Sequence, residues 1–167
     1  MAPGIPTEAC PGCGLVLPRS AGPTHPYIGA SAACWALYGE VLAREFQDRE
    51  RFGVHQLTVD TYAVQHPGTP EPRAARSVAL HLATLALFLE RGADPARGPL
   101  LHRRLVGRLD ETWLEPPSPN GTLTVADVHR TRDAAAHRRA VEAWARDVWA
   151  AWAPHHAIVR GRLGEAL

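Results

Sequence analysis

The sequence predicts an all-α protein, a bundle of about five helices that follows an irregular arm carrying cysteines. Three observations support this fold class. Apolar residues recur at helical spacing through much of residues 31–167, residues 1–30 are rich in proline and glycine, and strand-like alternation is lacking apart from a short extended piece expected around LVLP. A chain of 167 residues is expected to form one domain, with residues 1–30 as the arm and 31–167 as the bundle.

The first two helices follow from capping residues and a proline stop. Ser31 can cap a helix over about residues 32–46, and the polar stretch QDRERFG is expected to form a turn after it. Thr58 can then cap a short helix with the sequence VDTYAVQH. His66-Pro67-Gly68 ends that helix, because a helix rarely continues into proline.

The remaining helices lie in residues 74–167. Residues 74–92 are apolar nearly all round and end at Gly92, which predicts a buried helix. Residues 98–109 form a weaker helix, and EPPSPNG is a loop. Thr124 opens a helical stretch that continues into one long segment, DAAAHRRAVEAWARDVWAAW. Pro154 either kinks this segment or begins a new helix.

Composition excludes several classes of function. A formal net charge of +1, from 18 basic and 17 acidic residues, argues against a nucleic-acid binder, and His102-Arg103-Arg104 is interpreted as a solvated helix face. No apolar run approaches the roughly 20 residues of a membrane span. The N-terminus lacks the features of a signal peptide, so a cytoplasmic protein is expected, in which three cysteines would remain thiols or metal thiolates. Nine histidines point to metal chemistry or proton transfer.

Cys10 and Cys13 form a CPGC pair that could bind a metal ion. Two thiolates separated by two residues can hold one zinc ion from a tight turn. Redox activity of the thioredoxin type is disfavoured, because that fold places CxxC between a strand and a helix in a βαβ context, which this sequence lacks. A pair of free thiols in the arm remains the third interpretation.

A zinc site needs two further ligands, and Cys34 and His66 are the predicted ones. Helices joined by a short connection tend to run antiparallel, which would place Cys34, at the start of one helix, beside His66, at the end of the next. The arm precedes the first helix and can reach the same end. Cys10, Cys13, Cys34 and His66 are therefore the predicted ligands of zinc, or of iron or another divalent transition metal, with His81 as the alternative to His66.

A pocket beside this site is predicted to carry catalytic residues: His55, Asp60, His81 and His156. Asp60 could orient the imidazole of His55, and His81 is the polar residue of an otherwise apolar helix. Each residue also has a purely structural interpretation. Asp60 could stabilise a helix N-terminus, and His81 could be a core histidine whose hydrogen bonds are satisfied.

The stretches CPGCGL, YIGASAACWALYGEVLAREF, HQLTVDTYAVQHPG, SVALHLATLALFLERG and WAAWAPHH resemble a family of small bacterial proteins that is catalogued as a domain of unknown function. The resemblance spans roughly residues 9–160 and implies no established activity. It draws attention to Cys10, Cys13, Cys34, His55, Asp60, Gln65, His66, His81 and His156. A weaker likeness, carried by HHAIVRGRL, is to the metal-binding helical bundles of the DinB/YfiT type.

The function expected from these observations is that of a small zinc-binding helical protein. It would be a metal-dependent enzyme of hydrolysis or group transfer that acts on a small molecule in the His/Asp-lined pocket. The alternative is a non-enzymatic protein that senses metal or oxidant and whose zinc site is purely structural. Neither nucleic acid nor a membrane is expected as a partner, and the sequence does not predict the oligomeric state.

Overall fold

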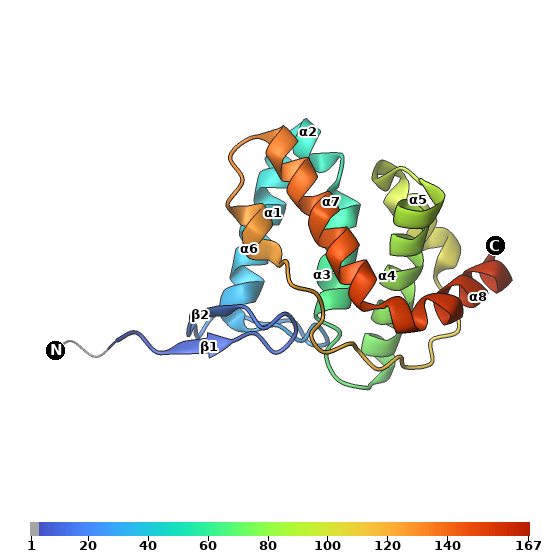
Figure 1. The fold of residues 1–167 in the computed structure, drawn as a ribbon, viewed down its shortest axis with the longest axis horizontal. Coiled ribbons are helices and arrows are strands. Elements are labelled where there is room, and N and C mark those ends of the chain that lie inside the picture. Colours follow the sequence, from blue (N-terminus) through green and yellow to red (C-terminus); the bar gives the residue numbers. More distant parts are fainter. Residues whose placement is uncertain (1–3) are drawn as a thin grey trace.

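The computed structural model describes residues 4–167 and shows a mostly helical protein with one small sheet (Figure 1). The predicted fold class needs two corrections, because these residues form eight α-helices instead of about five, and a β-hairpin lies in the arm. The helices are α1 Ala32–Gln47, α2 Arg49–Phe52, α3 His55–Gln65, α4 Pro72–Arg91, α5 Gly98–Leu105, α6 Val125–His129, α7 Ala134–Ala151 and α8 His156–Ala166; short 3₁₀ helices η1 Pro95–Arg97 and η2 Ala153–His155 precede α5 and α8.

Several predicted helix ends are confirmed by their capping contacts. The Ser31 hydroxyl accepts a hydrogen bond from the backbone N–H of Cys34 at the start of α1. Thr124 caps α6 in a capping box with Asp127. Gly92 ends α4 at a φ of 66°, in the left-handed region that a residue without a Cβ adopts at little cost.

The extra helices begin at capping aspartates that were not recognised in the sequence. The stretch expected to be a turn after the first helix contains α2, because the Asp48 carboxylate caps the backbone N–H groups of Glu50 and Arg51. The long helix expected after Thr124 is divided into α6 and α7, since Asp133 caps a new start at Ala134. The first change adds a helix where a turn was expected, and the second replaces one expected helix with two shorter ones.

Part of the expected irregular arm is a β-hairpin. β1 (Thr7–Ala9) and β2 (Val16–Pro18) pair antiparallel, with Thr7 opposite Pro18 and Ala9 opposite Val16. The short extended piece expected around LVLP is thereby confirmed. The hairpin lies at the end of the molecule where α1 begins, and its turn carries Cys10 and Cys13 (Figure 1).

Helix α3 lies in the middle of the molecule and packs mainly against α4 and α7 (Figure 1). Eight of its eleven residues are buried, and four of those eight are polar: Thr58, Asp60, Thr61 and Gln65. It begins at His55, so Thr58 lies inside the helix instead of capping it as expected. A central helix with so many buried polar side chains must find partners for them on its neighbours.

Among residues 4–167 there is no helix that combines the length and the apolar character needed to cross a membrane.

Candidate metal centre

Three thiols and one imidazole converge where the hairpin, α1 and α3 meet. Cys10 and Cys13 come from the hairpin turn, Cys34 from the first turn of α1, and His66 from the residue that ends α3. Their donor atoms all lie within 4.8 Å of one another. The Sγ atoms of Cys13 and Cys34 are 3.9 Å apart, and Cys34 Sγ lies 3.5 Å from His66 Nε2. The four residues predicted as ligands thus form one group that could hold a metal ion.

The antiparallel arrangement of α1 and α3 brings two of these residues together. At one end of the pair, Cys34 meets His66. At the other end, Thr58 near the start of α3 donates a hydrogen bond to Glu45 near the end of α1, at 2.6 Å. The two helices therefore run in opposite directions, which confirms the arrangement that was inferred from the short connection between them.

The hairpin turn presents its two thiols through a tight backbone conformation. The Cys10 N–H donates to the Leu15 carbonyl at 2.9 Å, and the Gly14 N–H donates to the Cys10 carbonyl at 2.9 Å. Gly12 lies so close to α3 that a Cβ at this position would come within 2.5 Å of His66 Cδ2 and 2.8 Å of the Gln65 carbonyl oxygen. The absence of a side chain at Gly12 lets the turn reach His66.

The surrounding groups orient the donor atoms through hydrogen bonds. His66 Nδ1 donates to the Tyr62 carbonyl at 2.8 Å, and this bond leaves the Nε2 lone pair facing Cys34. The backbone N–H of Ser31 donates to Cys10 Sγ, and the Tyr62 hydroxyl donates to Cys34 Sγ, each at 3.5 Å. Hydrogen bonds to sulfur favour the thiolate form, which is the form that binds metals.

The pKa values of the three thiols are shifted in different directions. Hydrogen bonds from Cys13 and Cys34 hold the pKa of Cys10 far below its ordinary value, although burial opposes this effect. The hydrogen bond to Cys10 in turn raises the pKa of Cys13 to about 11 and also raises the pKa of Cys34. A divalent cation in the centre would take the place of these protons and allow all three thiols to ionise.

The four residues predicted as catalytic do not share one pocket. Asp60 and His81 meet, with His81 Nδ1 donating to Asp60 Oδ1 at 2.6 Å. His55 instead bonds Glu45 Oε2 at 2.7 Å. Five residues of helix turn through about 140° relative to the starting direction, so His55 and Asp60 leave α3 on different sides. His156 stacks on the ring of Trp149, with 3.9 Å between the ring centroids, and its Nε2 bonds the Trp149 carbonyl.

His102 contacts Asp60 as well, although the sequence analysis interpreted it as part of a solvated helix face. Its Nε2 lies 3.0 Å from Asp60 Oδ1, whereas its neighbours Arg103 and Arg104 are exposed. The signal that could have revealed it is helical spacing, because His102 precedes the fully buried Leu105 by three residues and lies on the same side of α5.

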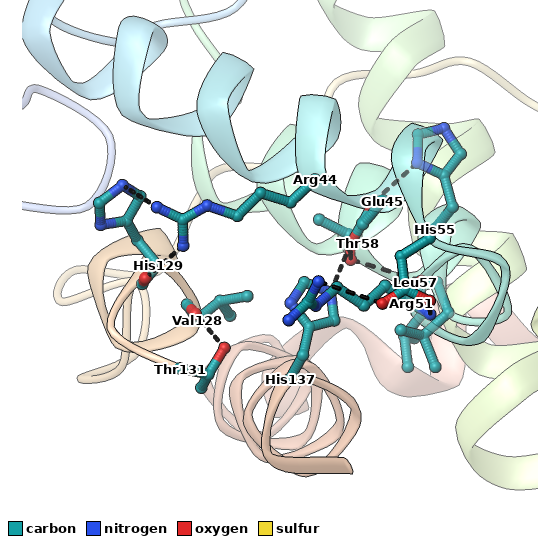
Figure 2. A network of polar contacts seen from close by, with 12 residues as sticks. Arg44, Glu45, Arg51, His55, Leu57, Thr58, Val128, His129, Thr131 and His137 are labelled. Atoms are coloured by element: carbon teal, nitrogen blue, oxygen red, sulfur yellow. Dashed lines mark hydrogen bonds and ion pairs between the residues drawn. The ribbon is translucent and has the colours of Figure 1, made fainter. Parts of the chain in front are cut away.

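A buried carboxylate at the end of α1 is the second feature that the sequence analysis missed (Figure 2). Glu45 is fully buried and bonds His55 Nδ1, His137 Nε2 and the Thr58 hydroxyl. Helical spacing again gives the signal, since Glu45 lies four residues after the buried Val41. This network joins α1, α3 and α7.

Comparison with known proteins places the chain in a family. The family model described as "Family of unknown function (DUF5946)" matches residues 8–153. The chain belongs to DUF5946. This match confirms the resemblance to a family of unknown function, and no curated protein and no solved structure matches the chain.

In this DUF5946 member a cavity of about 160 Å³ lies beside the cysteine-histidine group. Its wall includes Tyr27 of the N-terminal segment, Trp35 of α1, Tyr62 of α3 and His81 of α4. Tyr62 links the two sites, because its hydroxyl bonds Cys34 and its ring lines the cavity. A second cavity, of about 340 Å³, shares Tyr27 and His81 with the first and adds Arg73 to its wall.

Proposed function

We propose that this DUF5946 protein binds one zinc ion through Cys10, Cys13, Cys34 and His66. The observation that carries the proposal is the convergence of the four donor atoms within 4.8 Å, although they come from three separate segments. Three thiolates and one imidazole are a ligand set that structural zinc sites use. The His66 Nε2 lone pair and the hydrogen bonds to the sulfurs support the same proposal.

In this proposal the ion is structural. Four ligands from the protein complete a tetrahedral zinc site and leave no position for a substrate. Three of the ligands are also shielded from solvent, since Cys34 and His66 are fully buried and Cys10 is 2% exposed. The ion would hold the hairpin and the segment after it against α1 and α3. Because Tyr27 belongs to that segment, the ion would also fix one wall of the cavity.

Elemental analysis tests the zinc proposal directly. Protein purified without added metal should contain about one equivalent of zinc, and Cys13→Ser should lose most of it. His155→Gln is the matched control, because His155 bonds a loop carbonyl and lies outside the group, so its zinc content should stay at the wild-type level. Wild-type protein without zinc or another transition metal would refute the proposal.

We propose that the two cavities that share Tyr27 and His81 bind a small molecule, which would be a function beyond metal binding. His81 is part of the wall of both cavities, and the fully buried Asp60 accepts the hydrogen bond from its Nδ1. A histidine that is oriented by a carboxylate beside a cavity is typical of enzyme sites. The proposed reaction is hydrolysis or group transfer. His81→Gln should abolish turnover of a substrate found by screening aryl and phosphate esters, whereas His155→Gln should retain it.

Sensing of metal or oxidant is the second candidate function. Cys13 favours it, because this ligand is only partly buried and an oxidant can reach its sulfur. Mild treatment with hydrogen peroxide should then release the zinc ion, and a thiol reductant should restore its binding. Unchanged zinc content after treatment would exclude oxidant sensing at this centre.

A further inference from the structure

We propose that Asp60, His81 and His102 bind a second divalent transition-metal ion, separate from the thiolate centre. The three side chains come from three consecutive helices, α3, α4 and α5. One carboxylate oxygen and one ring nitrogen from each histidine all lie within 4.8 Å of one another. The proposal deepens the enzyme function given above, since it gives the His81 side of the cavity an ion that can take part in chemistry.

The hydrogen bonds of the Asp60 carboxylate all involve one of its two oxygens. Its Oδ1 is bonded by His81 Nδ1 at 2.6 Å, His102 Nε2 at 3.0 Å and Gln56 Nε2 at 2.8 Å. Its Oδ2 is buried and has no hydrogen-bond partner among residues 4–167. A fully buried carboxylate with one unpartnered oxygen is costly unless further positive charge lies close to it. A divalent cation would supply that charge.

The contacts of His102 Nε2 also support a cation site here. This nitrogen lies 3.2 Å from the amide nitrogen of Gln56, which is itself a donor to Asp60. If His102 Nε2 carries a proton, three donors, from His81, His102 and Gln56, are crowded against Asp60 Oδ1, whereas Oδ2 has none among residues 4–167. If it carries a lone pair, a second N–H of the Gln56 amide can donate to it at 3.2 Å, and the lone pair lies 3.0 Å from Asp60 Oδ1, close enough for both atoms to bind the same cation. A cation bound by both atoms would stabilise their close approach and supply the positive charge that the buried carboxylate needs.

The donor set differs in kind from the thiolate centre. Two imidazoles and one carboxylate suit ions such as Zn²⁺, Fe²⁺ and Mn²⁺, and three protein ligands leave coordination positions for water or a substrate. The side chains of His81 and His102 are 15% and 18% exposed, so solvent reaches the site. Gln56 would act as an outer partner that orients the carboxylate.

The location indicates the class of ligand. His81 is part of the wall of the larger cavity, which also includes Arg73 and Arg76, the second of which is paired with Glu111 at 3.0 Å. Guanidinium groups next to a Lewis-acidic ion favour anionic oxygen ligands such as carboxylates and phosphates. An ion with open positions could polarise such a group or activate a bound water, which is the chemistry that hydrolysis or group transfer requires.

Cobalt binding to the protein as purified tests this site apart from the thiolate centre. Zinc binds N, O and S donors more tightly than cobalt, so Co²⁺ added to protein that holds one equivalent of zinc should leave the thiolates occupied and fill the second site. We expect one equivalent of Co²⁺ to bind with visible d–d absorption and without a thiolate-to-cobalt charge-transfer band. The zinc content of the same sample, measured by elemental analysis, shows separately whether the thiolate centre is filled, so failure of that proposal is recognisable independently.

Four variants decide the assignment. Asp60→Asn and His102→Gln should weaken Co²⁺ binding by at least about 100-fold, and Gln56→Ala by about 10–100-fold, as expected for an outer partner. His155→Gln should bind cobalt like the wild type. His102→Gln changes a partly exposed side chain, so it remains informative if Asp60→Asn does not fold. The proposal is overturned if the zinc-loaded wild type binds no cobalt, or if His102→Gln binds it with unchanged affinity.

Discussion

Replacing Glu45 by alanine tests whether the fold depends on a carboxylate buried between α1, α3 and α7. This carboxylate accepts hydrogen bonds from His55 Nδ1 at 2.7 Å, His137 Nε2 at 2.8 Å and the Thr58 hydroxyl at 2.6 Å (Figure 2). Burial alone would raise the pKa of Glu45, but the hydrogen bonds, the one from His137 first among them, hold this pKa below its ordinary value. Glu45 is therefore ionised in the folded protein at neutral pH.

The expected cost follows from the burial of both partners. The side chain of Glu45 is 0% exposed and that of His137 is 2% exposed, so truncating Glu45 leaves His137 without its partner in the core. Removing one member of a buried ion pair costs about 3–5 kcal/mol. For a protein of this size about 1 kcal/mol shifts the melting temperature by about 2–4 °C. The melting temperature of Glu45→Ala should therefore fall by about 6–20 °C.

Glu40→Ala is the matched control, because it removes another glutamate–histidine pair from the same helix. Glu40 is 62% exposed and lies 2.7 Å from His129 Nε2. An exposed pair contributes about 0–1 kcal/mol, so this variant should melt within a few degrees of the wild type. Circular dichroism during heating and during urea unfolding measures both effects. The reasoning is refuted if Glu45→Ala loses no more stability than Glu40→Ala.

Three further predictions concern pH, metal and backbone. The contribution of Glu45 is present above the ordinary pKa of glutamate and is lost as the pH falls through its lower folded-state pKa, so urea unfolding of Glu45→Gln should show a flatter acid dependence than that of the wild type. Removal of the metal by a chelator should lower the melting temperature markedly, since binding free energy at a structural site is folding free energy, and an unchanged curve after verified removal would contradict a structural ion. Gly12→Ala should destabilise the protein by about 1–3 kcal/mol and weaken zinc binding in a chelator competition, because the new Cβ would meet His66 Cδ2 at 2.5 Å. Gly39→Ala, whose Cβ would meet nothing within 4 Å, should instead stabilise α1 by about 0.5–1 kcal/mol, and equal effects of the two changes would exclude a steric role for Gly12.

The cysteine-histidine group could be predicted because its spacing depends on local features. Cys10 and Cys13 share one turn, so two residues between them suffice to predict that they act together. Ser31 fixes the start of α1 and Pro67 follows the end of α3. A short connection then makes the two helices antiparallel, and Cys34 and His66 must lie at the same end.

The partners of Asp60 could not be predicted in the same way. His81 is 21 residues away and His102 is 42 residues away, and which histidine turns toward Asp60 depends on how α4 and α5 dock against α3. His55 lies only five residues from Asp60, yet the two side chains leave the helix on different sides. Proximity along the chain was therefore misleading here.

Capping residues, prolines and apolar periodicity are properties of short segments, and they were sufficient to locate most helices and one group of candidate metal ligands in this chain. Predicting the correct number of helices would have required recognising the caps at Asp48 and Asp133. The buried polar contacts of Glu45 and Asp60 depend on packing between helices that lie far apart along the chain. A buried charged group must be paired, but only the docked helices determine which partner comes within hydrogen-bonding distance.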